Sequence, residues 1–393
     1  MSTAAAARSR IAQLDFEIAD LQRSIDTRFA EREKCEDVLN SCKYPVLTLP
    51  VEITTYIFTK FLPGHPERPL LFGPESPSLL LQVCRQWRYV ALATPELWST
   101  MKLTLDDRGS SASQCLALDS WLQRSGNYPL SIELAFLLFT GITLVDAESM
   151  QTILRHASRW REMELCLPFN HLEQMTVAMP LLRSLTLGPT QLLPPYPRPP
   201  APPTTICMEA PNLREVNLSR FFNPLWIALP WAQITTIAGA DLYVNEAIEI
   251  LRHTVALECC RFTIVGYADF DPSTIPTTIP LPSLRSLTMV WDGYGLDQVE
   301  NVENLYLFFK ALSLPALESI HVSEYFLGQE PVATLSALWQ DGDPAEIEIV
   351  DAQVSEDVYA AAFPRAKLSV ESMSSDEDES WDESRDEDED ESY

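Results

Sequence analysis

The sequence predicts an α/β protein in which helical segments come first and a long region of alternating strands and helices follows. Three observations lead to this prediction: a charged N-terminal stretch with helical periodicity, a second apolar helical stretch, and a phrase that recurs through the rest of the chain. With 393 residues, 46% of them hydrophobic, the chain can build one large core or two smaller ones.

Residues 1–43 are predicted to form one long helix, because the stretch from Ser9 to Lys43 is rich in charge and contains neither Gly nor Pro. Its apolar residues recur at alternating spacings of three and four, at Ile11, Leu14, Ile18, Leu21 and Ile25. This heptad seam, with Ile at one position and Leu at the other, favours two parallel strands, although Arg28 and Arg32 interrupt it. The segment is therefore expected to form either a homodimeric coiled coil or a lone helix docked on the protein's own body.

A second helical segment follows the corner formed by Leu49 and Pro50. Proline has its φ preset for the first helical position, which leaves Leu49 at the N-cap. An apolar side chain cannot accept bonds from the free amides of the first turn, so this helix start is poorly capped. Beyond it, Ile53, Ile57 and Phe61 form one of two adjacent apolar stripes, an arc wider than one packing partner requires.

Residues 63–77 contain five prolines and are predicted to be a loop. A further helix should begin at Ser76-Pro77, and Thr94-Pro95 starts a very short one. The face of the longer helix consists of Leu80, Val83, Cys84, Trp87 and Ala91. So few short helices cannot bury this much apolar surface among themselves.

These segments resemble the F-box family. The matching residues are Leu49-Pro50-x-Glu52-Ile53, Ile57-Phe58, Val83-Cys84-Arg85-x-Trp87-Arg88, Ala91, Pro95, Leu97 and Trp98. The resemblance implies a three-helix module over 44–100 that binds a Skp-type adaptor, which attaches to a cullin scaffold carrying a ubiquitin-loaded enzyme. On this resemblance the adaptor-binding residues are Leu49, Pro50, Ile53, Ile57, Phe58, Val83, Cys84 and Trp87. The alternative is that they are core residues of a helical subdomain.

The body, residues 101–368, contains strand patterns separated by helical ones. Apolar residues alternate with polar ones at 101–105 and 130–134, as in half-buried strands. The phrase Pro-x-Leu-x-x-apolar-x-apolar then starts at Pro180, Pro211, Pro282 and Pro315, with weaker copies at 160–165, 230–237 and 257–262. Helical patterns intervene at 150–154, 247–251 and 299–312. Pro-rich residues 189–203 are expected to form an extended loop.

This repetition resembles leucine-rich repeats, in which one short strand per repeat stacks beside the next. The resemblance implies an α/β solenoid with strands on the concave side, and an irregular one, because the family's asparagine after the last leucine is missing. Side chains flanking the inward apolar positions are expected to face a protein target or, equally, to be ordinary solvated positions. They are Glu164, Thr186, Asn217, Thr288 and His321.

Residues 369–393 are predicted to be a disordered acidic tail, since they lack the apolar content that would offset chain entropy. The simple interpretation is a solubilising tail. Four serines have an acidic residue three positions later, the pattern that kinases of the casein kinase type favour. They are Ser374, Ser375, Ser380 and Ser384.

The formal net charge of -28 and the lack of a basic stripe argue against nucleic acid and anionic membrane partners. The eight cysteines show no framework of regular spacings, which is typical of an intracellular protein of the cytoplasm or nucleus. The five histidines are scattered, and phosphate-binding and nucleophile motifs are missing, so no catalytic residue, metal or cofactor is predicted.

The sequence therefore predicts a non-catalytic subunit of a ubiquitin ligase, whose F-box binds the adaptor and whose repeat domain binds an unknown protein substrate. The alternative is an interaction scaffold that acts outside ubiquitin transfer.

Overall fold

The structure is a computed structural model. It describes residues 2–41, 45–64, 67–106, 112–137, 147–167, 172–173, 175–188, 204–219, 224–266, 272–292, 302–339 and 344–372. Within it the chain forms two compact units, the first made of Met1–Phe61 and Leu80–Ala93, the second of Leu62–Leu79 and Thr94–Tyr393. The short 3-10 helices are Pro45–Thr48, Pro77–Leu79, Pro95–Trp98, Ala157–Arg159, Pro224–Trp226, Trp231–Gln233, Pro272–Thr274 and Glu324–Phe326.

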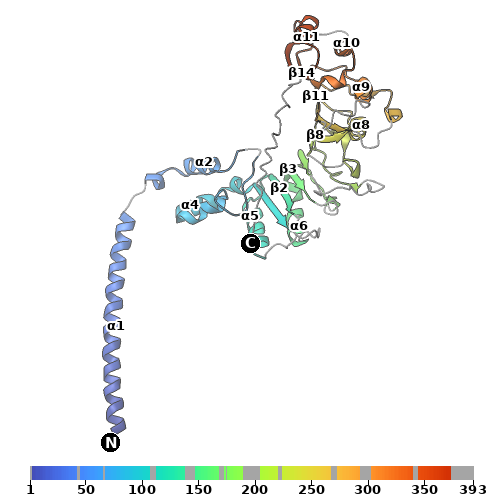
Figure 1. Cartoon of the computed structure of the whole chain (residues 1–393). Helices are drawn as coiled ribbons and strands as arrows, with labels where there is room; N and C mark the ends of the chain where they lie inside the picture. The colour runs from blue at the N-terminus through green and yellow to red at the C-terminus, as the bar shows by residue number, and fades with distance from the viewer. Residues whose placement is uncertain are drawn as a thin grey trace, which may run out of the picture. The chain divides into compact units, whose positions relative to one another are not determined.

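The first unit is helical and contains α1 (Ser2–Ser41), α2 (Val51–Phe61), α3 (Leu80–Val83) and α4 (Arg85–Leu92). The long N-terminal helix predicted from the sequence is confirmed, and it runs without a break over 40 residues (Figure 1). Helix α2 begins one residue later than predicted, so Pro50 rather than Leu49 precedes its first turn. The Pro50 carbonyl accepts a hydrogen bond from the Thr54 amide at 3.1 Å. Neither Leu49 nor Pro50 has a polar side chain that could cap the helix.

The interior of the first unit lies between α2 and α4. On α2, Thr54 and Phe58 are buried one turn apart, and the Phe58 ring meets the Trp87 ring edge to face with centroids 5.0 Å apart. The helix predicted to run on through Cys84 is broken there, because Cys84 has extended backbone angles (φ -156°, ψ 169°). Its sulfur accepts the Trp87 amide at 3.4 Å and so caps α4.

The second unit is built on one parallel sheet of eleven strands. Each strand pairs with the next sheet strand along the chain, in the order β1-β2-β3-β4-β6-β8-β9-β11-β13-β14-β15. Figure 1 shows β2, β3, β8, β11 and β14 following one another in chain order. The strands are β1 (Thr100–Asp106), β2 (Leu130–Leu137), β3 (Trp160–Cys166), β4 (Ser184–Leu187), β6 (Glu215–Leu218), β8 (Thr236–Tyr243), β9 (Cys259–Gly266), β11 (Ser286–Trp291), β13 (Ser319–Ser323), β14 (Glu346–Ala352) and β15 (Lys367–Ser372).

One face of this sheet holds the core, because equivalent apolar residues of successive strands lie side by side and are buried. Two such rows run across the sheet. They contain Met101, Ile132, Met163, Leu185, Val216, Ile237, Cys260, Leu287, Ile320 and Ile347, and Leu103, Leu134, Leu165, Leu187, Leu218, Phe262, Met289, Val322 and Ile349. The strand positions predicted from the recurring phrase are confirmed.

The remaining elements of this unit are helices and two minor sheets. The helices are α5 (Ala112–Arg124), α6 (Ala147–Leu154), α8 (Val244–His253), α9 (Val302–Lys310), α10 (Pro331–Ser336) and α11 (Glu356–Ala362). The minor sheets pair β5 (Thr204–Thr205) with β7 (Ile227–Ala228) and β10 (Ile279–Pro280) with β12 (Leu312–Ser313). Helices α6, α8 and α9 coincide with predicted helical patterns, whereas α5, α10, α11, β14 and β15 were not predicted.

The structure corrects the predicted start of the acidic tail and leaves other predicted segments undescribed. Strand β15 runs to Ser372, so residues 369–372 form part of the sheet rather than of the acidic tail. The tail serines Ser374, Ser375, Ser380 and Ser384 and the whole proline-rich stretch 189–203 lie outside the described residues. Among the helices described, none is both long and apolar enough to cross a membrane.

Candidate functional site

The first candidate site is an exposed apolar surface on the first unit, called here the α2 surface and made of Leu49, Pro50, Ile53, Ile57 and Val83. Ile53 and Ile57 lie one turn apart on α2 and are 47% and 45% exposed, while Val83 at the end of α3 is 56% exposed. Leu49 is half-buried and Pro50 exposed. Exposed apolar side chains of this kind are a feature typical of surfaces that bind other proteins.

The other three predicted adaptor residues, Phe58, Cys84 and Trp87, are buried or half-buried. Phe58 is 1% exposed and lies against Trp87, which is half-buried, and Cys84 caps α4. The corner before α2 is fixed to α4, because the Gln86 side-chain amide donates to the Leu47 carbonyl at 3.0 Å. Phe58, Cys84 and Trp87 therefore position the α2 surface rather than form its outer face.

The second candidate site is the polar face of the sheet. The five residues predicted to face a target occupy one register row, which also continues through strands that were not predicted. The row runs Leu70, Lys102, Glu133, Glu164, Thr186, Asn217, Ala238, Arg261, Thr288, His321, Glu348 and Ser369. None of these twelve side chains is buried. Equal offsets within the recurring phrase align them, because the strands pair in parallel and in register.

The first half of this row lines a hollow of about 1050 Å³, the β1–β8 hollow, formed by β1, β2, β3, β4, β6, β8 and the segment 63–75. Its charged lining consists of Glu67, Glu75, Glu133, Glu162, Glu164, Glu215, Arg68, Lys102, Arg161 and Arg183. Carboxylates outnumber basic groups by six to four, and Ser184, Thr186, Asn217 and Thr236 supply neutral polar groups. A polar ligand with several hydrogen-bonding groups fits such a lining better than an apolar one.

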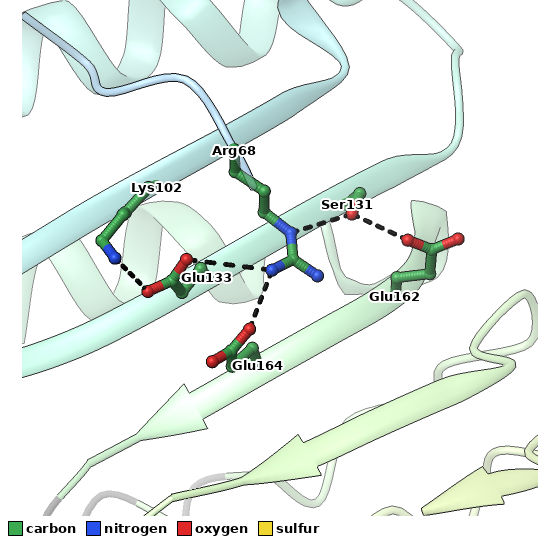
Figure 2. A network of polar contacts seen from close by, with 6 residues as sticks. All are labelled: Arg68, Lys102, Ser131, Glu133, Glu162 and Glu164. Atoms are coloured by element: carbon green, nitrogen blue, oxygen red, sulfur yellow. Dashed lines mark hydrogen bonds and ion pairs between the residues drawn. The ribbon is translucent and has the colours of Figure 1, made fainter. Parts of the chain in front are cut away.

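One end of the hollow holds a network centred on Arg68, shown in Figure 2. Its Nη1 lies 2.9 Å from a Glu164 oxygen and 3.8 Å from a Glu133 oxygen, and its Nε donates to the Ser131 hydroxyl at 3.0 Å. Ser131 donates in turn to Glu162 at 3.0 Å. Lys102 joins from β1, with its Nζ 2.6 Å from Glu133. The Arg68 side chain is only 8% exposed, and these carboxylates compensate the cost of burying its positive charge.

Backbone pairing holds Arg68 in place. Leu70 forms a parallel bridge with Lys102, whose amide donates to the Pro69 carbonyl at 2.8 Å. Leu71 is buried, and the buried Ser76 hydroxyl donates to the Leu71 carbonyl at 3.1 Å. The segment predicted to be a plain loop thus covers the edge strand β1, which would otherwise present unpaired backbone groups.

The sequence analysis missed Arg68. A signal for it was present, because Glu133 and Glu164 occupy equivalent positions of neighbouring strands, and two carboxylates side by side require a cation. Nothing near Arg68 in the sequence identifies that cation, since Glu164 lies 96 residues further along the chain.

Within the part of the chain that the structure describes, no cluster of three His, Cys, Asp or Glu side chains could hold a metal ion. Cys166 lies on β3, where burial, with a smaller contribution from Glu164 and Glu133, raises the pKa of its thiol to about 11. A protonated thiol is a poor nucleophile. In comparisons with known proteins, no protein-family model matches the chain, and no curated protein matches it.

Proposed function

We propose that this chain is the substrate-recognition subunit of a ubiquitin ligase of the Skp, cullin and F-box type. The observation that carries the proposal is the α2 surface, because it lies where the F-box pattern predicts adaptor contacts and its apolar side chains are uncovered in the first unit. Burying an Ile side chain contributes about 1.5–3 kcal/mol, so a few such residues suffice for stable binding. A non-catalytic role inside the cell, in the cytoplasm or nucleus, fits the two binding surfaces.

Truncating the α2 surface should weaken adaptor binding. We expect Ile57→Ala to raise the dissociation constant for a purified Skp-type adaptor about tenfold or more, which corresponds to about 1.4 kcal/mol. Isothermal titration of the full chain measures this effect. The matched control is Tyr89→Ala, which removes a large, 72% exposed side chain from α4 on the side away from Trp87. Failure of the wild-type chain to bind, or equal losses in both variants, would contradict the proposal.

The second unit is proposed to be a leucine-rich-repeat-like solenoid that holds the target. Support comes from strands that pair in chain order and from two apolar rows on one face of the sheet. On the other face, the row containing Glu164, Thr186 and Asn217 presents polar side chains of successive strands to one ligand. The β1–β8 hollow gives that ligand a place to enter.

Lysines placed in the hollow should abolish target capture without affecting the adaptor. We expect proteins labelled in proximity to the wild-type chain, and accumulating when the proteasome is inhibited, to disappear with Thr186→Lys plus Asn217→Lys. Glu356→Lys, an exposed change on α11, should leave that set of proteins unchanged. An unaltered set in the double variant would remove the hollow from the proposal.

The alternative, a scaffold outside ubiquitin transfer, makes a different prediction for the assembly. A ligase subunit should bring down both the adaptor and a cullin when it is immunoprecipitated, whereas a scaffold that uses the adaptor alone need not bring down the cullin. Adaptor without cullin would therefore favour the alternative.

A further inference from the structure

Helix α1 presents apolar residues that nothing in the described chain covers. From residue 6 to residue 39 every side chain is exposed. The large apolar side chains among them are Ile11, Leu14, Phe16, Ile18, Leu21, Ile25, Phe29, Val38 and Leu39. Most of the stability of a helix in a protein comes from an apolar face packed against a partner, and among the described residues α1 has no such partner.

The exposed residues are arranged for a helix partner of the same kind. Numbered as a heptad from a to g with Ile11 at a, the a positions hold Ile11, Ile18, Ile25, Arg32 and Leu39, and the d positions hold Leu14, Leu21, Arg28 and Cys35. Isoleucine at a with leucine at d is the combination that favours two parallel strands. We propose that α1 pairs with α1 of a second copy of this chain, in parallel and in register, through these a and d positions.

The charges of α1 complement those of an identical helix. The helix carries six basic and eight acidic residues, so two copies repel each other only weakly. In a parallel pair, a residue at g faces the residue at the following e of the other helix, which places Arg10 opposite Asp15 of the second copy.

The two arginines in the seam, Arg28 and Arg32, each form an ion pair with a glutamate of the same helix. Arg28 Nη1 lies 3.6 Å from Glu31, and Arg32 Nη2 lies 2.8 Å from Glu36, and both acids occupy positions that flank the seam. Long arginine side chains keep their charged ends in water while their stems cover apolar surface. A polar residue at a seam position lowers the stability of the pair but helps to specify its register, and the neighbouring carboxylates balance the charge of the two arginines.

This pairing does not depend on the proposed function of the other surfaces. If both hold, one dimer carries two α2 surfaces and two hollows. Two sites joined in this way bind a target with two contact points more tightly than either site alone.

Disulfide formation at Cys35 tests the parallel register. Cys35 is exposed, free and at a d position, and a disulfide needs Cα atoms about 4.4–6.8 Å apart, which facing positions of in-register helices satisfy. In the full chain carrying Cys42→Ser, mild oxidation with diamide should give a covalent species of twice the 44.3 kDa of the chain. The same species should be lost when Cys35→Ser is added. An antiparallel pair would hold the two Cys35 side chains apart and give no such product.

Sedimentation of the reduced chain at micromolar concentration provides an independent test. We expect the wild type to be a dimer and Leu21→Asp, at a d position, to be a monomer. Phe16→Asp is the matched control, because Phe16 is as exposed as Leu21, at 69% against 63%, but lies at the f position outside the seam. A monomeric wild type, or equal dissociation by both substitutions, overturns the proposal, and neither outcome bears on adaptor binding.

Discussion

Replacing Arg68 with alanine should lower the free energy of unfolding by about 3 kcal/mol, because it leaves partly buried carboxylates without their cation. The Glu133 side chain is 14% exposed and faces Glu164 on the neighbouring strand, so loss of the guanidinium places two like charges side by side. Lys102 still pairs with Glu133 and limits the loss. Denaturant unfolding followed by tryptophan fluorescence measures this change.

Two further variants separate the loss of the network from a general effect of removing an arginine. Arg183→Ala, in the same hollow, removes an exposed arginine that lies 3.7 Å from Glu215 and should cost less than about 1 kcal/mol. Adding Glu164→Gln to Arg68→Ala should restore part of the lost stability, because it removes the negative charge of Glu164, which has lost its Arg68 partner and lies beside that of Glu133. Equal costs for the two arginine substitutions would show that Arg68 does not hold the edge of the sheet.

Replacing Glu246 with glutamine should stabilise the protein near neutral pH by up to about 3 kcal/mol. Glu246 lies in the first turn of α8, is 4% exposed, and accepts a hydrogen bond from the Tyr243 amide at 2.9 Å. Burial raises the pKa of this carboxyl from its ordinary 4.5 to about 7, while the Tyr243 bond opposes the shift. A glutamine oxygen can accept the same amide and carries no charge.

The sign of the pH dependence follows from the raised pKa of Glu246. In the unfolded chain the carboxyl loses its proton near pH 4.5, whereas in the folded chain it keeps that proton until about pH 7. Its contribution to stability is therefore fully present below pH 4.5 and is lost as the pH rises through about 7. Unfolding measured at several pH values should show this slope in the wild type and a smaller one in Glu246→Gln. Glu303→Gln, an exposed change in the first turn of α9, should keep the slope of the wild type.

Local periodicity was enough to predict the main-sheet strands from β1 to β13 and three of the six α-helices described in the second unit, α6, α8 and α9. An apolar residue at every second position fixes which side chains enter the core, and equal offsets in successive copies fix which polar residues share a row. That is why Thr186, Asn217, Thr288 and His321 could be selected before the strands were paired. Strands β14 and β15 were missed because the spaced phrase Pro-x-Leu-x-x-apolar-x-apolar does not occur there.

The supporting contacts could not be predicted, because they join residues that are far apart in the sequence. Phe58 matches an F-box position like its neighbour Ile57, yet packing against Trp87 places one inside and leaves the other exposed. Cys84 continues an apolar helical face in the sequence, and only its extended backbone shows that it ends one helix and caps another. Arg68 depends on Ser131, 63 residues away.

The division of the chain into units has a consequence for any attempt to isolate the F-box-like segment. The chain crosses from one unit to the other three times, after Phe61, Leu79 and Ala93. A fragment cut at residues 44 and 100 therefore carries residues 62–79 without the strands that they pair with. It would expose Leu71 and leave the Arg68 guanidinium without a carboxylate, so such a fragment should aggregate or misfold where the full chain does not.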